Sequence, residues 1–336
     1  MQIKENYSLK ALNTFGVEAR AKYLVELNSI EETQKFIKSD LFLNNKFLLL
    51  GGGSNILFTQ DYDGVILKIN YKGKDIISAD ENNVYIKAFA GETWDEFVNY
   101  CTFNNWGGIE NLTAIPGNVG TSPVQNIGAY GAEVKDTIVS VEVIRIEDGE
   151  ILTFKNEECK FGYRNSIFKN EVKNKYIITS VTFKLDKQPK LNTSYGAIKE
   201  ELEKMYLEPS VINISKAIAV IRQNKLPDPK VKGNAGSFFK NPVVTKEHLD
   251  TLLLKYPKIR YFPSDNDFKL AAGWLIEKIG MKGKTFGNAA VHNKQALVLI
   301  NNDNAKGKEI LGLANLIQQK IKEAFDVELE IEVNIV

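Results

Sequence analysis

Two side chains of this 336-residue chain stand out as candidates for chemistry, Ser237 and Arg164. Ser237 lies in the run "GNAGSFFKNP" (residues 233–242), where it follows two small residues and precedes two phenylalanines. A serine after glycine most often completes a turn or caps an element, so this run alone favours a structural role. Arg164, in "GYRNS", is a permanent cation suited to a carboxylate or an enolate, although an arbitrary arginine more often forms a surface ion pair.

The scarcity of histidine and cysteine narrows the chemistry that the chain can perform. His248 and His292 are the only histidines, and Cys101 and Cys159 are the only cysteines. These numbers argue against a histidine-based metal centre, a cysteine zinc site or a disulfide framework, so we expect no metal. Catalysis is left to Ser, Arg, Lys, Tyr and carboxylate side chains, or to a bound cofactor.

Composition is that of a globular protein long enough for two or three domains. Hydrophobic residues make up 43% and charged residues 25%, and 43 Lys+Arg against 42 Asp+Glu give a formal net charge of +1. This balance does not indicate a nucleic-acid partner. The polar N-terminus lacks the apolar core of a signal peptide, and no apolar stretch reaches the roughly 18 residues of a membrane span. We therefore expect a cytoplasmic protein.

Two glycine-rich loops indicate a phosphate-bearing cofactor. "GGGSN" (residues 51–55) ends an apolar strand, where successive backbone N–H groups can bind an anion; a plain glycine-rich hairpin is the alternative. It is not the dinucleotide fingerprint, because Ile56 stands where the third glycine would be. "AIPGNVGTSPVQNIGAYG" (residues 114–131) has four glycines and two prolines. Structureless loops of that length are usually functional or disordered, and apolar anchors such as Val119 argue against disorder.

The remaining pattern places these loops among strands in the first half and alternates helices with strands in the second. Strands are predicted at 46–50, 64–70, 83–91 and 176–185, a hairpin around the "EDGE" turn at 139–154, and a helix that begins at Thr93. Helical spacing follows at 196–206, 214–225, 245–256 and 305–325, with strands at 295–302 and 327–336. The main boundary falls near residues 186–210.

The predicted last strand, "VELEIEVNIV", carries three glutamates on one face. Strand alternation places Glu328, Glu330 and Glu332 opposite the apolar residues between them. Periodicity alone indicates a solvated face and does not choose among the three.

Six motifs occur in the order in which they occur in the UDP-N-acetylenolpyruvoylglucosamine reductase family, and the resemblance extends from Asn13 to the last strand. The motifs are "GGGSN", "IPGNVGTSPVQNIGAYG", "FGYRNSIF", "KLPDPK", "GNAGSFFKNP" and "KLAAGWLIEKIG". Each alone is weak, but the combination is highly specific. Tyr195, in "SYGAIKEEL", is similar to the longer subtype, in which a tyrosine-bearing loop covers the substrate.

The resemblance implies an α+β fold with a two-part FAD-binding domain of the vanillyl-alcohol-oxidase (PCMH) type, followed by an α+β substrate-binding domain. The implied bounds are 16–187, with subdomains at about 1–70 and 71–187, and 208–336, whose last strand returns to the active site. The implied enzyme is UDP-N-acetylmuramate dehydrogenase. It uses NADPH and non-covalent FAD to reduce the enolpyruvyl ether of a UDP-sugar for peptidoglycan synthesis. We expect a monomer with a small-molecule partner, no nucleic acid and no membrane span.

That reaction delivers hydride to C3 of a double bond conjugated to a carboxylate, and negative charge spreads from C2 as an enolate. The resemblance implies that Ser237 donates the proton to C2 and that Arg164 and Glu332 share the catalysis. It implies substrate contacts from Tyr195, Asn241 and Lys225, the last by its charge on the diphosphate, although a solvated loop lysine is the alternative. The implied cofactor-binding residues are Gly51, Gly52, Gly53, Ser54, Asn55, Ile115, Pro116, Gly117, Thr121, Ser122, Gln125, Asn126, Gly128, Ala129, Tyr130 and Arg222.

Two other functions are compatible with parts of this pattern. A flavin oxidase of the same broad fold would use dioxygen, but its usual flavin-linking His or Cys is missing from both glycine loops. A sugar-nucleotide sensor would not need a proton donor. One departure from the family matters: where relatives often read L-E-P-E-V-R, this chain has Ile331 and Asn334, which leaves open the charged flavin contact that the arginine would make.

Overall fold

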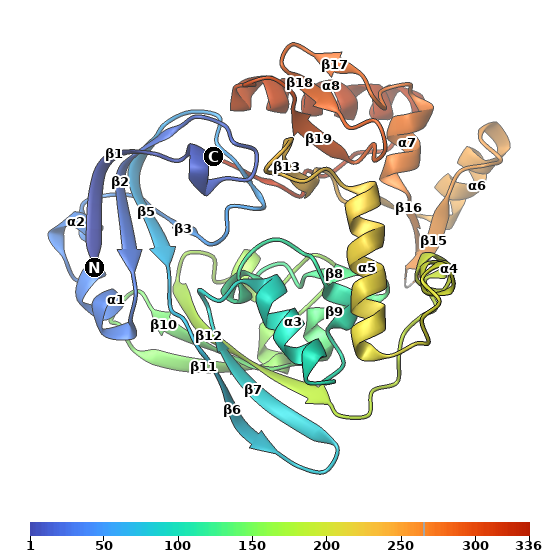
Figure 1. Cartoon of the computed structure of the whole chain (residues 1–336). Helices are drawn as coiled ribbons and strands as arrows, with labels where there is room; N and C mark the ends of the chain where they lie inside the picture. The colour runs from blue at the N-terminus through green and yellow to red at the C-terminus, as the bar shows by residue number, and fades with distance from the viewer. Residues whose placement is uncertain (265) are drawn as a thin grey trace. The chain divides into compact units, whose positions relative to one another are not determined.

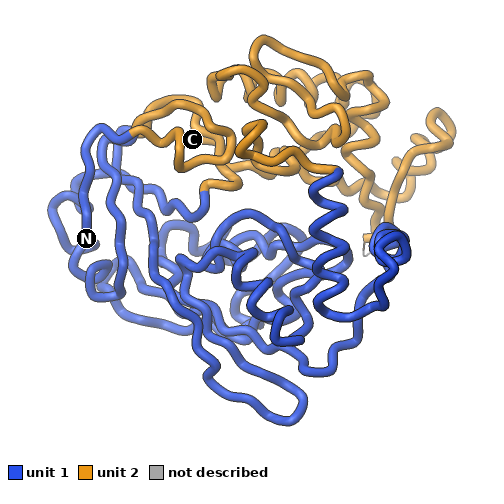
Figure 2. Tube along the Cα trace, viewed as in Figure 1, with its two compact units in different colours: residues 1–7, 21–52, 63–224 blue, residues 8–20, 53–62, 225–336 orange. Residues whose placement is uncertain are grey.

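The computed structural model describes residues 1–264 and 266–336 (Figure 1). Contacts divide the chain into two compact units, each assembled from separate segments (Figure 2). Unit 1 comprises Met1–Tyr7, Ala21–Gly52 and Asp63–Asn224, and unit 2 comprises Ser8–Arg20, Gly53–Tyr62 and Lys225–Val336.

The first sheet of unit 1 has the strand order β1-β2-β5-β3, in which β3 and β5 run parallel. The two predicted strands at 46–50 and 64–70 are confirmed here. Helices α1 and α2 begin after Ser29 and Ser39, whose hydroxyls accept hydrogen bonds from backbone N–H groups of the first turn. The elements are β1 (Gln2–Ser8), β2 (Arg20–Leu27), α1 (Ile30–Phe36), α2 (Asp40–Leu43), β3 (Phe47–Leu50) and β5 (Tyr62–Ile69).

The second sheet of unit 1 is antiparallel, with the order β11-β10-β12-β7-β6. Its core includes Trp94 and Phe97 of helix α3, whose ring centroids lie 5.9 and 4.9 Å from that of Phe183. The helix after Thr93 and the hairpin around "EDGE" are confirmed. The elements are β6 (Lys74–Ala79), β7 (Asn83–Phe89), α3 (Trp94–Phe103), β10 (Ile138–Arg145), β11 (Ile151–Lys155) and β12 (Tyr176–Asp186).

Two helices complete unit 1, α4 (Gly196–Lys204) and α5 (Val211–Lys225). Their apolar faces share a cluster that includes Ile198 and Ile218, and Tyr130 packs against it. Helix α5 therefore belongs with unit 1 almost to its end. The predicted domain bounds of 16–187 and 208–336 stay a prediction.

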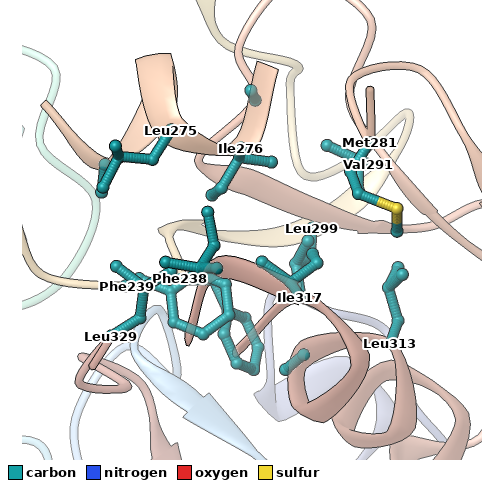
Figure 3. Packing of buried hydrophobic residues seen from close by; sticks show 14 of the residues in the cluster. Phe238, Phe239, Leu275, Ile276, Met281, Val291, Leu299, Leu313, Ile317 and Leu329 are labelled. Atoms are coloured by element: carbon teal, nitrogen blue, oxygen red, sulfur yellow. The ribbon is translucent and has the colours of Figure 1, made fainter. Parts of the chain in front are cut away.

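Unit 2 is built around the sheet β13-β19-β18-β17 and helix α8, whose buried side chains form its core (Figure 3). Phe238, Ile276 and Ile317 meet there from a strand end and two helices. The main elements are β13 (Gly233–Ser237), α6 (Lys246–Lys255), α7 (Ala272–Lys278), β17 (Thr285–Phe286), β18 (Ala289–Val291), β19 (Val298–Asn301) and α8 (Gly307–Phe325). Its short strands are β4 (Ile56–Leu57), β14 (Val243–Val244), β15 (Tyr261–Ser264), β16 (Asp267–Leu270) and β20 (Asn334–Ile335).

The end of the chain differs from the prediction of one strand over 327–336. Only Asn334–Ile335 forms a strand, β20, which pairs in parallel with β4, and Ile331 makes a single bridge to Phe239. The inside–outside alternation is present, because Val327 and Leu329 are buried while Glu328 and Glu330 are exposed. A ladder is missing because this segment changes its partner from one neighbour to another. Among the described helices, none is both long and apolar enough to cross a membrane.

Candidate active site

The two glycine loops touch each other within unit 1. A Cβ atom on Gly51 would lie 2.5 Å from Cγ2 of Thr121, and one on Gly52 would lie 2.9 Å from the backbone of Gly117. Glycine is required at position 52 because a fixed backbone atom, and not a flexible side chain, occupies that space. The structure thus brings together two runs that are more than 60 residues apart in the chain.

The second loop is held in shape by hydrogen bonds within itself, to Gly91 and to the first residue of helix α3. The backbone N–H of Trp94 donates to the carbonyl oxygen of Gly117 at 3.0 Å, and Asn118 Nδ2 donates to that of Gly91 at 3.0 Å. The Ser122 hydroxyl is fully buried and donates to the Val119 carbonyl at 2.7 Å. Ser122 therefore shapes the loop with its hydroxyl, and any cofactor contact it makes is through its backbone.

Two guanidinium groups accompany this loop. Arg164 Nη2 donates to the Gly128 carbonyl at 2.8 Å, and Arg222 Nε donates to the Ala114 carbonyl at 3.2 Å. Burial lowers the pKa of Arg222, the positive charge of Arg164 acts in the same direction, and Tyr130 and Asp95 oppose the shift. Two cations therefore lie at the loop, where they can contact an anionic ligand.

Tyr195 lies against the same loop. Its ring makes an edge-to-face contact with that of Tyr130, with centroids 5.4 Å apart. Asn192 Nδ2 donates to the Gly131 carbonyl at 3.2 Å, which ties the start of the tyrosine segment to the end of the glycine loop. Burial raises the pKa of Tyr130, and the nearby Arg222 opposes that shift. Tyr195 itself is exposed, so its ring is available to a ligand.

Ser237 ends strand β13 in unit 2, after an irregularity in the pairing with β19. Asn234 organises this irregularity: its Oδ1 accepts from the Gly236 N–H at 2.9 Å, and its Nδ2 donates to the Pro227 carbonyl at 3.1 Å. Phe238 and Phe239 are both buried. Ser237 is exposed between the buried residues Asn234 and Phe238. Its hydroxyl makes no hydrogen bond within the part of the chain that the structure describes. A turn-closing role for the hydroxyl would require such a bond.

Glu332 lies beside the Ser237 strand and differs from the other two glutamates. Its backbone N–H donates to the Phe238 carbonyl at 2.8 Å. Glu328 and Glu330 are exposed and form ion pairs, with Lys322 at 3.3 Å and with Lys240. Glu332 is half-buried. The solvated-face interpretation therefore fits Glu328 and Glu330, and geometry sets Glu332 apart.

The first glycine loop continues into the same region of unit 2. Asn55 Nδ2 donates to the Glu332 carbonyl at 3.2 Å, and Asn334 Nδ2 donates to the Asn55 carbonyl at 2.9 Å. A Cβ atom on Gly53 would lie 1.9 Å from the Leu12 carbonyl oxygen, so only glycine fits there. Asn334, which replaces the family's arginine, holds the loop backbone.

The two remaining substrate candidates have different surroundings. Asn241 Oδ1 accepts from the Ala272 N–H at 3.0 Å and so caps the first residue of helix α7. Lys225 is exposed at the end of helix α5. Of the three catalytic candidates, Arg164 belongs to unit 1, and Ser237 and Glu332 belong to unit 2.

The residues present fit a non-covalent flavin dinucleotide. The first loop presents glycines without side chains where it meets the second loop, two guanidinium groups lie at the second loop, and neither loop contains His or Cys. No group of three or more His, Cys, Asp or Glu side chains among the described residues is arranged to hold a metal ion. Sequence reasoning missed Asn234 and Asp95, whose carboxylate accepts from the Ala114 N–H at 2.6 Å. The asparagine two residues before a glycine was a usable turn signal.

Comparisons with known proteins agree with this geometry. Residues 21–155, which include both glycine loops, match the FAD binding domain, and residues 228–336 match the UDP-N-acetylenolpyruvoylglucosamine reductase C-terminal domain. The reductase of that name from Flavobacterium johnsoniae is 51% identical over 339 aligned positions, covering 100% of both chains. The chain belongs to the UDP-N-acetylenolpyruvoylglucosamine reductase family.

Solved structures show the same fold. The reductase (MurB) from Thermus caldophilus covers 99% of this chain and 98% of its own, with a TM-score of 0.69 at 22% identity. p-Cresol methylhydroxylase covers 96% of this chain and 83% of its own, with a TM-score of 0.50 at 13% identity. The predicted α+β fold with a PCMH-type FAD-binding domain is confirmed.

Proposed function

We propose that this chain is a UDP-N-acetylmuramate dehydrogenase. It reduces UDP-N-acetyl-3-O-(1-carboxyvinyl)glucosamine to UDP-N-acetylmuramate with NADPH and FAD, in the synthesis of peptidoglycan for cell wall growth and division. The observation that carries this proposal is 51% identity over the full length to a reductase of this family. The backbone hydrogen bond from Glu332 to Phe238 supports it, because Phe238 directly follows the candidate catalytic Ser237.

FAD is held by the two glycine loops, through the residues from Gly51 to Asn55 and the second loop, with Arg222 contributing charge. When bound, FAD carries the reducing equivalents of NADPH to the double bond of the substrate. The close packing of Gly52 on Gly117 fixes the loops against each other before the cofactor binds. Such preorganisation lowers the entropy lost on binding.

The protein's own side chains act where charge develops on the substrate. Arg164 is a fixed guanidinium suited to the carboxylate and to the enolate that forms from it. Ser237 donates the proton to C2, since its hydroxyl is exposed and makes no hydrogen bond among the described residues. Serine is a weak acid in water, but it suffices beside a strongly basic carbanion in a site that excludes water. We assign Glu332 to the same step, because its backbone N–H bonds to the residue after Ser237.

The proposed reaction also assigns substrate contacts, domain bounds and a cellular compartment. Tyr195 supplies a ring, Lys225 a charge for the diphosphate, and Asn241 an amide for the UDP-sugar. We propose the domain bounds 16–187 and 208–336 for the cofactor and substrate parts. Because NADPH and UDP-sugars are cytoplasmic metabolites, we also propose that the enzyme works in the cytoplasm, as a monomer.

Ser237→Ala tests the assignment of the proton donor, because it separates the two halves of the reaction. Reduction of the flavin by NADPH involves no proton transfer to C2 and should stay near the wild-type rate. Reoxidation by the enolpyruvyl substrate should slow by about 10²–10⁴-fold. Anaerobic stopped-flow at the flavin absorption band measures each half. Ser237→Cys, a better acid of similar size, should recover part of the rate.

The opposite pattern would remove Ser237 from the mechanism. If the alanine variant slows reduction by NADPH and leaves substrate-driven reoxidation intact, the serine is structural. A protein that purifies without a yellow chromophore and does not bind added FAD would contradict the cofactor itself.

A further inference from the structure

Asn126, in the middle of the second glycine loop, is fully buried. Both the nitrogen and the oxygen of its side-chain amide form hydrogen bonds with other protein groups. Its Nδ2 donates to Glu133 Oε2 at 2.9 Å and to the Gly162 carbonyl at 3.0 Å, and its Oδ1 accepts from the Lys135 N–H at 3.1 Å. If the amide were flipped, Oδ1 would face two other acceptors, Glu133 Oε2 and the Gly162 carbonyl oxygen. The positions of Oδ1 and Nδ2 are therefore fixed by their partners. Both amide hydrogens are spent, and none is left for a cofactor.

One of these partners, Gly162, begins the turn that carries Arg164. Gly162 and Asn165 exchange two backbone hydrogen bonds of 3.1 Å each, which close the turn. Arg164 within it has φ = 52°, a left-handed conformation that side-chain-bearing residues seldom adopt. A conformation of this kind persists only where the surroundings impose it.

A second side chain holds the same turn from its other end. The Ser166 hydroxyl is buried and donates to the Val124 carbonyl at 2.7 Å. The guanidinium of Arg164 reaches back to the Gly128 carbonyl at 2.8 Å. A Cβ atom on Gly128 would lie 3.2 Å from Arg164 Nη1, so the loop backbone also limits where the guanidinium can lie.

We propose that Asn126 and Ser166 are positioning residues that lock the Arg164 turn onto the second glycine loop. The second glycine loop then has two roles. One part of its backbone holds the cofactor, and another part sets the position of the Arg164 guanidinium, which acts on the negative charge that develops on the substrate. The inference rests on the proposed function, in which Arg164 acts on the enolate. It assigns the side chain of Asn126 to arginine placement and not to cofactor contact.

Asn126→Asp is the sharpest test, because it keeps the shape and tolerates a left-handed backbone but removes the two donors and places a carboxyl group against the Glu133 carboxylate. Asn174→Asp is the matched control: Asn174 is exposed and also left-handed, with φ = 62°. FAD affinity, flavin reduction by NADPH and flavin reoxidation by the enolpyruvyl sugar are measured separately. We expect Asn126→Asp to slow reoxidation by about 10- to 100-fold. FAD affinity and reduction by NADPH should stay within about threefold of wild type.

Ser166→Ala, which loses one hydrogen bond, should show the same selectivity with a smaller effect, and it covers the case in which Asn126→Asp does not fold. Arg164→Lys completes a double-mutant cycle. If Asn126 acts through the guanidinium, its penalty on reoxidation should shrink to less than about threefold in the Arg164→Lys background.

Two results would overturn the inference. One is an equal penalty for Asn126→Asp with Arg164 or with Lys at that position. The other is a loss of FAD affinity that accounts for the whole effect in both the Asn126 and the Ser166 variants. A different result, reoxidation unaffected by Arg164→Lys itself, would instead contradict the proposed role of Arg164.

Discussion

At the scale of residues, the three glutamates near the C-terminus show what a sequence pattern can and cannot decide. Alternation alone predicted that they share a face, and Glu328 and Glu330 are indeed exposed. It could not distinguish Glu332, because the difference comes from Phe238, almost a hundred residues away in the chain. The same holds for Ser237, whose surroundings include Leu297, a backbone partner of Phe238 at 2.8 Å. Only the resemblance to a family selected both residues from the sequence.

Glu332→Gln should impair turnover severely, by about 10²–10⁴-fold if its carboxyl takes part in proton transfer. Glu328→Gln and Glu330→Gln each remove only an exposed ion pair, worth at most about 1 kcal/mol, and should leave kcat nearly unchanged. Steady-state NADPH oxidation with the enolpyruvyl sugar measures all three variants under one condition. Equal and mild effects at the three positions would contradict the assignment of Glu332.

At the scale of elements, strands and helices with strong periodicity were predictable, and their partners were not. The helix after Thr93 and the hairpin around "EDGE" follow from local signals. The last segment carried an equally regular pattern, yet only Asn334–Ile335 is a strand. Alternation reports which side of a segment is buried. A ladder also needs a continuous neighbour, which the local sequence does not specify.

Asn334→Asp should weaken the attachment of β20 to the first glycine loop. The change removes the side-chain donor at the Asn55 carbonyl, while the Asn334 backbone N–H still donates there at 3.1 Å, so the cost should be about 0.5–1.5 kcal/mol in the free energy of unfolding. Because Asn55 also donates to the Glu332 carbonyl, kcat should fall as well. Thermal unfolding and turnover are measured together, with Asn174→Asp as the exposed control. An unchanged Tm would show that the side chain of Asn334 does not stabilise the attachment of β20 to the first glycine loop.

The packing of α1 on the first sheet predicts a loss of stability in alkali. Burial raises the pKa of Tyr71 to about 12, although its hydrogen bond with Thr33 opposes the shift. In the unfolded chain the same hydroxyl ionises near its ordinary value of 10. Below pH 10 both states hold the proton and Tyr71 adds no pH dependence. Between pH 10 and about 12 the unfolded state loses it first, so the free energy of unfolding falls.

Tyr71→Phe should remove about 1–3 kcal/mol of that alkaline loss while losing the hydrogen bond to Thr33 at neutral pH. Urea unfolding of both proteins at pH 8 and pH 11.5, roughly within the window set by this shift, gives the difference. If the two proteins lose the same stability between these pH values, Tyr71 does not titrate as described.

At the scale of the whole molecule, the family assignment depends on the order of the motifs and on how much of the chain they span, more than on any single motif. Each glycine loop alone is compatible with an ordinary hairpin. Together they touch, and they lie within the residues that match the FAD binding domain. The candidate catalytic residues come from both units, and each unit also draws on segments remote from its main part of the chain. No local window of sequence contains all of these candidates, which is why recognising them required the motifs in their full order.

The proposed function requires that NADPH oxidation by this protein is coupled to reduction of the enolpyruvyl UDP-sugar. The most direct test follows NADPH absorbance and UDP-N-acetylmuramate by mass spectrometry in one reaction, in air and under nitrogen, with and without the sugar. We expect equimolar NADPH loss and product formation, at the same initial rate in both atmospheres, and negligible NADPH loss without the sugar. NADPH oxidation that requires dioxygen and proceeds regardless of the sugar would contradict it and indicate a flavin oxidase.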